Sequence, residues 1–274
     1  MKKAQRNKGL LRLVLALALL VVLVFSLVRL IRYAVSSLSD KKTNQQLQEM
    51  YREAEDAANT QEPASNVDEV SKTELSDQYQ YIGNSVLPEL KGFLMENHDT
   101  VAWLRISGDI VDLPVVYRNN TYYLEHNFYR EKSEGGTLFL DEMHPFLEDT
   151  QYLVIHGHSM QDGSMFGLLT HYRNEGYIEE HPTLTLSTLY RKEEYEVIGV
   201  LCVPEDVNSD GFVPYLGMRK FRSAEQFYDF AKIIRKNALH WKEGAEMHAN
   251  DALLALSTCY EDERIVVMCR RTSP

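Results

Sequence analysis

The sequence contains little cysteine, with only three such residues among 274. So low a content excludes a small domain held together by disulfides, and an odd number leaves at least one thiol unpaired. Internal repeats and low-complexity tracts are also absent. Because 44% of the residues are hydrophobic and 25% are charged, the composition predicts a globular protein with an ordinary apolar core.

Acidic residues are missing from positions 1–32, although the whole chain has a formal net charge of −11. That segment carries seven Lys or Arg residues, so the rest of the chain has a net charge of −18. A body this acidic argues against nucleic acid as a partner, because phosphate binding requires clustered cations. It is compatible with a cationic or neutral peptide substrate.

A long apolar run occupies residues 10–31 and consists almost wholly of Leu, Val and Ala. As a helix, about 22 residues would extend roughly 33 Å, enough to cross the hydrocarbon core of a bilayer. A cleaved secretory signal has a shorter apolar region that ends in small residues, whereas this run leads into Arg29-Leu30-Ile31-Arg32-Tyr33. We therefore expect an uncleaved transmembrane anchor, with residues 1–9 as a cytoplasmic basic tail and the body outside the cell.

The region after the anchor, residues 32–75, has the pattern of a stalk or linker that contains a helix. Apolar residues recur at helical spacing over 44–58, which predicts either a free stalk helix or a helix packed on the main domain. Residues 61–72 are polar and predict a linker. The remainder, residues 76–274, is expected to form one domain that begins with a helix near 86–96.

Short apolar stretches typical of strands dominate from residue 100 onward. Eight of them predict a mainly β fold with accessory helices, arranged as a barrel or a sandwich. A long insertion at 204–245 separates the sixth from the seventh and contains a predicted helix over 223–239; connections of this length tend to be functional. The predicted strands are 101–106, 111–116, 136–140, 152–157, 184–189, 195–201, 252–258 and 264–270.

The last two predicted strands carry the strongest chemical signal. Alternation along ALLALSTC places Cys259 at a strand end, and the four residues 260–263 return the chain to Arg264. A guanidinium beside a thiol favours the thiolate, which is the nucleophilic form, and it can also bind an oxyanion. The alternative is a buried cysteine beside an ordinary surface arginine, and the pattern does not set the register that would decide between them.

Two histidines follow another predicted strand in the segment YLVIHGHSMQDGSMFG, residues 152–167. A strand end can present at least one imidazole for acid–base catalysis. His156 and His158, at a spacing of two, could instead bind a metal, although neither a Cys-x-x-Cys motif nor clustered carboxylates accompany them, and either could be structural. The pattern alone leaves the choice between the two histidines open.

These motifs, in this order, resemble the sortase family and in particular its class B members. LSTC followed by RIVV, with GHSMQDGSMF before them, carries the resemblance, and NHDTVAWLRI, IVDLPVVYRNNTYYLEHNFY and GGTLFLD match successive earlier blocks. The match covers about residues 85–271. It implies a sortase-type eight-stranded β-barrel with N-terminal helices, a helix-containing insertion between its sixth and seventh strands, and a single N-terminal transmembrane helix.

The resemblance also implies catalytic roles for particular residues. Cys259 corresponds to the nucleophile of the family, and His158, which follows the glycine of the Gly-His motif, corresponds to its catalytic histidine. The arginine that opens the last strand corresponds to Arg264, with Arg270 and Arg271 as weaker rivals. Neither a metal nor another cofactor is implied.

Substrate-binding residues are implied in two places. Ser257 and Thr258 lie in the motif that ends in the nucleophile, where Ala255 replaces the leading threonine of the family. Asn120 falls where class B members carry an asparagine near the substrate groove.

The activity that the resemblance implies is that of a membrane-anchored cysteine transpeptidase. Such an enzyme cleaves a C-terminal sorting signal of a secreted protein after threonine and transfers the acyl group to an amine of a cell-wall precursor or a pilin. Its implied location is the membrane of a Gram-positive type envelope, with the catalytic domain extracellular.

Three alternatives are weighed against this activity. One is a cysteine peptidase that hydrolyses the same kind of signal, and another is a non-catalytic surface binding module on a sortase scaffold. A pilus-type sortase is less favoured, because such members often carry a second hydrophobic segment at the C-terminus, which we do not expect here.

Overall fold

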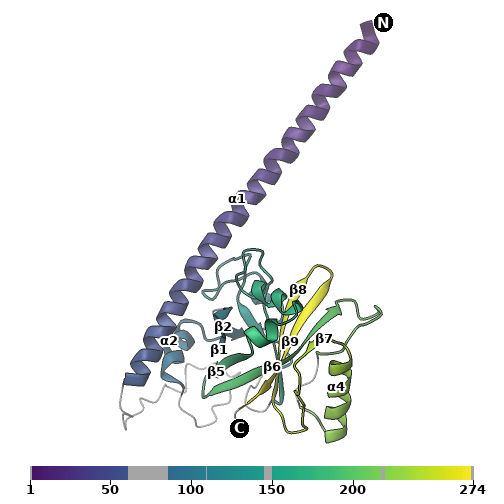
Figure 1. Cartoon of the computed structure of the whole chain (residues 1–274). Helices are drawn as coiled ribbons and strands as arrows, with labels where there is room; N and C mark the ends of the chain where they lie inside the picture. The colour runs from purple at the N-terminus through teal and green to yellow at the C-terminus, as the bar shows by residue number, and fades with distance from the viewer. Residues whose placement is uncertain (1, 61–85, 109, 145–149, 217–219, 273–274) are drawn as a thin grey trace.

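The chain forms a β-barrel from which a long N-terminal helix projects (Figure 1). The structure is a computed structural model that describes residues 2–60, 86–108, 110–144, 150–216 and 220–272, with side chains described from residue 15 onward. The helices are α1 (Lys2–Thr60), α2 (Pro88–Glu96), α3 (Tyr177–Glu180) and α4 (Ala224–Lys236), with 3-10 turns η1 (Tyr122–Leu124) and η2 (Gly167–Arg173). The strands are β1 (Thr100–Ile106), β2 (Val111–Tyr117), β3 (Leu138–Leu140), β4 (Tyr152–His156), β5 (Thr183–Thr188), β6 (Lys192–Pro204), β7 (Ala238–Trp241), β8 (Leu253–Tyr260) and β9 (Glu263–Arg271).

Eight of these strands close into a barrel. Their order is β5-β1-β2-β3-β4-β8-β9-β6, and β6 pairs back to β5. Most neighbours are antiparallel, but β4 and β8 are parallel, as are β2 and β3. The eight-stranded barrel predicted from the sequence is therefore confirmed, and each predicted strand has a counterpart within a few residues.

The insertion between β6 and β8 differs from the prediction in one respect. The helix predicted over 223–239 ends at Lys236, and the chain continues as β7, which pairs with the edge of β6. Gly199 of β6 allows this pairing, because a Cβ atom there would lie 2.4 Å from a ring carbon of Trp241. A helical continuation would have withdrawn this indole from the sheet.

The inner and outer faces of the barrel wall are both apolar on the side of β8. Leu254 and Leu256 belong to the cluster inside the barrel, whereas Leu253 and Ala255 join a second cluster with Phe227 of α4. A strand buried on both faces needs apolar residues at successive positions, which accounts for the run ALLAL. In Figure 1, α4 covers this side and α1 and α2 lie on the other side of the barrel.

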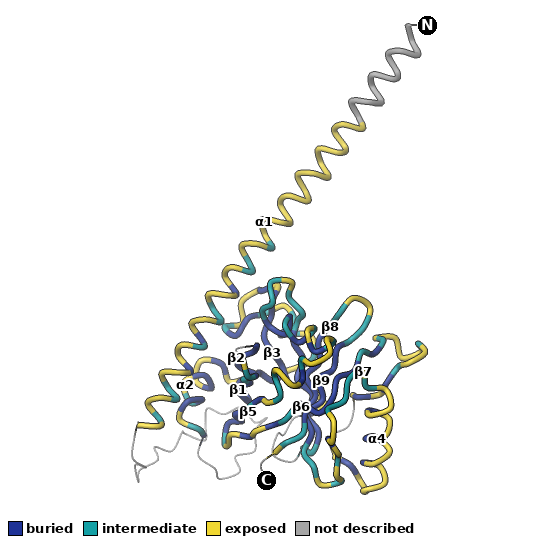
Figure 2. Tube along the Cα trace, in the orientation of Figure 1, coloured by how far each residue is buried: buried dark blue, intermediate teal, exposed yellow. Residues whose placement is uncertain are grey.

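The C-terminal part of α1 is packed on the barrel. The helix changes from fully exposed to partly buried as it reaches the barrel (Figure 2), where Leu47 and Tyr51 are almost completely buried. The ring of Tyr51 stacks on Trp103 with 4.2 Å between centroids, and its hydroxyl donates to Ser187 Oγ at 3.1 Å. Of the two arrangements open for the helix predicted over 44–58, the packed one is found. The predicted linker over 61–72 lies outside the described residues.

The helix is also attached to the loop that follows β4. Ser37 donates a hydrogen bond to Asp162 at 2.6 Å, and Lys41 forms an ion pair with the same carboxylate at 3.3 Å. Burial raises the pKa of Asp162, but hydrogen bonds from Ser164, Ser37 and Lys41 lower it by more. The net pKa lies well below the usual value of an aspartate. This carboxylate is therefore charged at neutral pH and links α1 to the loop.

Replacement of Tyr51 with Ala tests the packing of α1. Loss of a buried ring that stacks on Trp103 should reduce the free energy of unfolding by about 3 kcal/mol. Tyr228→Ala is the matched control, because Tyr228 is half-exposed on α4 and its loss should cost less than about 1 kcal/mol. Chemical denaturation of both variants measures the difference, and equal effects would show that α1 does not pack as described.

Candidate active site

Two parallel strands end side by side at one end of the barrel. β4 and β8 pair in register up to His156 and Ser257. The chain continues two residues further on each strand to His158 and Cys259, so both reach the same edge of the barrel. Thr258 reinforces this arrangement, since its hydroxyl donates to the carbonyl of Gly157 at 2.8 Å.

The glycine between the two histidines allows the chain to pass through a crowded position. A Cβ atom at Gly157 would lie 2.4 Å from a methyl carbon of Leu138 and 2.8 Å from a ring carbon of Phe166. A larger residue would push the strand end, and the histidine that follows it, away from the barrel. The Gly-His motif thus has a steric basis here.

The hairpin of β8 and β9 brings Arg264 opposite Cys259. The two residues are direct partners in the antiparallel ladder, as are Tyr260 and Glu263. Only two residues form the turn, and Glu261 adopts a left-handed conformation with φ of 53°. Because directly paired residues project to the same face, this register places the guanidinium and the thiol side by side.

A cavity of about 440 Å³ lies at this end of the barrel. The thiol, the guanidinium and both histidines line it, and the insertion after β6 supplies one wall. The lining residues are Asn120, Leu124, Phe139, Asp141, His156, Gly157, His158, Pro204, Glu205, Phe212, Tyr215, Leu216, Cys259 and Arg264.

Glu205, at the start of the insertion, lies between the thiol and the guanidinium. Its Oε1 atom is 2.9 Å from Nε of Arg264 and accepts a hydrogen bond from Sγ of Cys259 at 3.7 Å. Burial raises the pKa of the Cys259 thiol; the charge of Arg264 lowers it, and the Glu205 carboxylate raises it again. The net shift is upward. The sequence predicted that Arg264 would favour the thiolate, whereas in this structure burial and Glu205 outweigh it.

The imidazole of His158 is held by the main chain of η1. Its Nε2 atom lies 2.8 Å from the carbonyl oxygen of Leu124. A carbonyl only accepts, so Nε2 carries a proton and Nδ1 is the position at which a neutral ring can accept one. His158 is half-buried at the boundary of the cavity, where it can exchange protons with a bound molecule.

A hydrogen-bonded group made of Asp141, His156 and Asn120 also lines the cavity. His156 Nε2 is 2.9 Å from Asp141 Oδ2, and Asn120 donates to the same oxygen at 3.0 Å. Burial raises the pKa of Asp141, but hydrogen bonds from His156 and from the main-chain N–H of Met143 outweigh it and lower the pKa below its usual value. The sequence left a choice between the two histidines. The structure pairs His156 with a carboxylate and leaves His158 at the cavity boundary.

The predicted substrate-binding residues occupy different positions. Asn120 lines the cavity. Ser257 and Thr258 are completely buried, and Ser257 Oγ is hydrogen-bonded to the hydroxyl of Tyr215 at 2.9 Å. Both residues lie behind the cavity wall and bond to protein groups, and their predicted contact with substrate stays a prediction.

The remaining cysteines and arginines lie away from this cavity. Cys269 is fully buried, and Cys202 donates to Glu263 at 2.6 Å. Burial and this carboxylate raise the pKa of Cys202 to about 11. Arg270 and Arg271 stand at the far end of β9, where they pair with Glu196 and Glu193. These positions suit packing and ion pairing.

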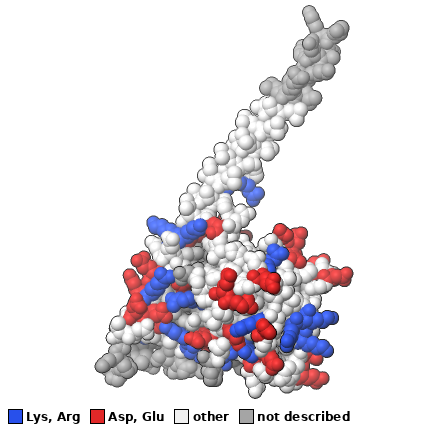
Figure 3. Space-filling model, in the orientation of Figure 1, with Lys and Arg blue, Asp and Glu red and all other residues white. Residues whose placement is uncertain are grey.

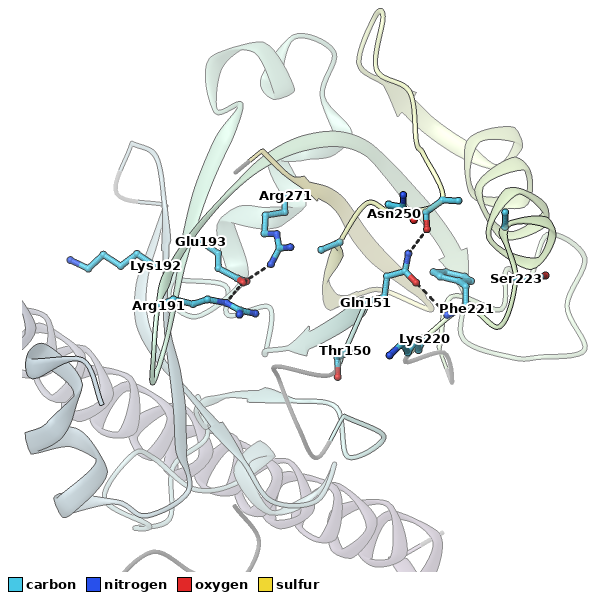
Figure 4. Close-up of a pocket in the computed structure, with 13 residues that line it drawn as sticks. Thr150, Gln151, Arg191, Lys192, Glu193, Lys220, Phe221, Ser223, Asn250 and Arg271 are labelled. Atoms are coloured by element: carbon cyan, nitrogen blue, oxygen red, sulfur yellow. Dashed lines mark hydrogen bonds and ion pairs between the residues drawn. The ribbon is translucent and has the colours of Figure 1, made fainter. Parts of the chain in front are cut away.

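A larger cavity of about 610 Å³ lies at the opposite strand ends (Figure 4). Two of its arginines, Arg191 and Arg271, share Glu193 at 2.6 and 2.7 Å. Gln151 donates to the carbonyl of Ala249 at 2.7 Å. The described lining contains neither cysteine nor histidine, whereas the smaller cavity contains both. Within the described part of the chain, His, Cys, Asp and Glu form no group of three that could hold a metal ion.

Three residues of the site were missed by sequence reasoning. Glu205 and Tyr215 come from the insertion, and Asp141 follows β3. Acidic residues are common after position 32, and a single carboxylate after a strand carries no distinguishing pattern. The length of the insertion was the one available signal for Glu205 and Tyr215.

Comparison with known proteins identifies the type of site. No protein-family model matches the chain. The sequence is 28% identical over 194 residues to sortase B of Listeria monocytogenes, and 25% identical over 191 residues to sortase B of Staphylococcus aureus. Each alignment covers 68% of this chain and 75% of the relative. A solved Staphylococcus aureus sortase B–substrate complex has the same fold, with a TM-score of 0.71 at 19% identity over 87% of this chain and 99% of that one.

These relatives, together with the barrel, indicate a cysteine transpeptidase. The chain is similar to class B sortases in sequence and in fold, which agrees with the resemblance carried by its motifs.

Asp141→Asn tests the buried pair beside the cavity. Because the pKa of Asp141 is depressed, its stabilising contribution is present above the unfolded pKa of about 3.9 and is lost as the pH falls through the lower folded value. We expect the variant to unfold more easily by about 1–3 kcal/mol at pH 7, and the difference to shrink below about pH 4. Urea denaturation over this pH range measures it. A difference that stays constant would contradict the assignment of a charged Asp141.

Proposed function

We propose that the chain is a membrane-anchored sortase that cleaves a C-terminal sorting signal after threonine and transfers the acyl group to an amine. The proposal rests on one observation above all. Cys259 and Arg264 are direct partners across the hairpin, and His158 follows the adjacent parallel strand, so that all three line one cavity. The names of the curated relatives support the same chemistry.

In the first step, Cys259 attacks the carbonyl carbon of the signal threonine. The thiol proton passes to His158, and the resulting thiolate forms a bond to carbon. Arg264 donates hydrogen bonds to the oxygen that becomes negatively charged. His158 then gives its proton to the departing amine as the peptide C–N bond breaks, which leaves a thioester on Cys259.

In the second step, an amine attacks the thioester. His158 takes the proton of the amine, a new amide bond forms, and Cys259 leaves as a thiolate that regains its proton. A cell-wall precursor or a pilin would supply the amine. A second groove of about 900 Å³ runs between α1 and the 124–134 segment, and it shares Leu124 and His158 with the first cavity. This groove supports a separate approach for the acceptor while the acyl group fills the first cavity.

The signal itself is expected to be of the Asn-Pro or Ser-Pro type, as the class B resemblance implies. Asn120 supports this expectation, because it lines the cavity where the resemblance expects a substrate contact. Phe212 and Leu216 of the insertion supply apolar contact area for a peptide. We therefore place the sorting signal in the cavity that contains Cys259.

Membrane anchoring is supported by α1. Among the described residues, one helix is long and apolar enough to cross a bilayer. Its large apolar side chains are exposed, and the part of the projecting helix that Figure 3 colours is almost wholly white, whereas the body carries both signs of charge. We place this segment in the membrane, the basic N-terminal residues in the cytoplasm and the barrel outside.

Cys259→Ala tests the nucleophile. The variant should lose all transfer of a sorting-signal peptide to triglycine, because no other side chain in the cavity can form the thioester. Cys202→Ala is the matched control and should retain transfer. Mass spectrometry of the products separates transfer from hydrolysis, since a ligated peptide forms only in transfer. Activity that persists in Cys259→Ala would reject the proposed nucleophile, and hydrolysis without ligation in the native protein would favour a peptidase.

Arg264→Lys tests the oxyanion donor. Lysine keeps the charge but loses the planar set of N–H groups, so kcat/KM for transfer should fall by roughly 100-fold. Arg270→Lys makes the same change at the other end of β9, where the guanidinium bonds to Glu196, and it should leave transfer unchanged. Steady-state kinetics of the two variants measure the contrast. Equal rates would mean that Arg264 only balances charge.

A further inference from the structure

Glu205 contacts both the Arg264 guanidinium and the Cys259 thiol in the cavity. A single carboxylate oxygen lies 2.9 Å from Nε of Arg264 and 3.7 Å from Sγ of Cys259. A substrate carbonyl about to be attacked needs its oxygen in this region, in front of the thiol and hydrogen-bonded to the guanidinium. Glu205 therefore occupies the place of the substrate carbonyl in the free protein.

The structure permits this side chain to leave. Glu205 directly follows Pro204, the last residue of β6, and its side chain is 46% exposed. A carboxylate that is already half in water exchanges a protein partner for solvent at little cost in free energy. The ladder to Cys259 and Val203 fixes the backbone of Arg264 within β9, and its side chain is less exposed, at 32%. Withdrawal of the Glu205 side chain into solvent therefore opens the site without moving the strand that carries Arg264.

Several charged or titratable groups line the cavity that contains the thiol. Arg264 comes from β9, Glu205 from the insertion and His158 from the loop after β4. In the Asp141–His156 pair, the carboxylate directly follows β3 and the imidazole ends β4. Tyr215 bonds to Ser257 behind the wall. Glu205 is the negative group in contact with both Cys259 and Arg264, so its displacement removes a negative charge from the thiol and releases the guanidinium in one movement.

We propose that Glu205 is a positioning residue that occupies the Arg264 donor site and holds the Cys259 thiol protonated until a substrate carbonyl displaces it. This inference rests on the proposed function of Cys259 and Arg264. Substrate binding and activation of the nucleophile are thereby coupled. The departure of the carboxylate leaves the positive charge of Arg264 uncompensated beside both the sulfur and the carbonyl oxygen. Without substrate, the thiol is protected from reaction with other electrophiles.

Two variants separate the charge of Glu205 from its occupancy of the site. Glu205→Gln removes the charge but keeps an oxygen that can accept from Arg264, whereas Glu205→Ala removes both. Asp206→Asn is the matched control, because it removes the same charge one residue away, where the carboxylate accepts hydrogen bonds from Asn208. All are made in the full chain, purified in detergent, and compared with the native protein by thermal unfolding.

The first measurement is the rate of iodoacetamide alkylation of Cys259 as a function of pH, followed by mass spectrometry of the peptide that contains it. We expect both Glu205 variants to react several-fold to tenfold faster at neutral pH, with the midpoint of the profile displaced to lower pH. Asp206→Asn should follow the native profile. An unchanged profile in both Glu205 variants would overturn the proposal. This measurement does not depend on transfer activity, so its result is separate from that of Cys259→Ala.

The second measurement is the transfer of a sorting-signal peptide to triglycine. Glu205→Ala should lower KM by about threefold or more, because the substrate no longer competes with a side chain for Arg264. Glu205→Gln should lower KM less than Glu205→Ala, because its amide oxygen still occupies Arg264. A large loss of kcat in both variants would instead make Glu205 the base that accepts the thiol proton, and would overturn the positioning role.

Discussion

The two-residue turn between β8 and β9 determines the geometry on which the site depends. With Tyr260 paired to Glu263, Cys259 must face Arg264, and the thiol and guanidinium project to the same side of the sheet. A slip of one residue would turn the arginine to the opposite face, away from the sulfur. The left-handed backbone of Glu261 allows the chain to reverse in so short a distance. The pairing of thiol and guanidinium is thus a property of hairpin register as much as of residue type.

The rest of the barrel keeps this hairpin rigid. β8 is buried on both faces, with Leu254 and Leu256 inside the barrel and Leu253 and Ala255 against the layer that includes α4. On its other edge it pairs in parallel with β4, which brings His158 to the same end. Parallel strands that end together present their following residues to one place, as in other folds whose sites lie at strand ends. The hydroxyl of Thr258 donates to the carbonyl of Gly157 across these two strands. It thereby holds the two strand ends together from behind the cavity wall.

Much of the fold could be predicted from the sequence because strand periodicity and apolar content are local properties. The eight barrel strands, the helix-containing insertion and the C-terminal hairpin all follow from such patterns. The prediction that Cys259 is the nucleophile came from motif order, since the pattern around it left the hairpin register open. Features that depend on contacts between distant segments could not be predicted. Glu205 is separated from Arg264 by 59 positions, and Tyr51 meets Trp103 only after the barrel has closed. The strand β7 was missed because its pairing depends on the space that Gly199 leaves for Trp241.

The continuity of α1 has a consequence for how the protein would meet other molecules. The helix runs without interruption from Lys2 to Thr60, and Ser37, six residues beyond the apolar run and so roughly 9 Å further along the axis, already bonds to the barrel. If the apolar run lies in a bilayer, as proposed, no flexible tether separates the site from the lipid surface. The catalytic end would stay at a constant height, and its search for partners would be confined to diffusion in two dimensions. Only a substrate and an acceptor presented at that height would react, so the membrane itself would act as a filter on what is joined.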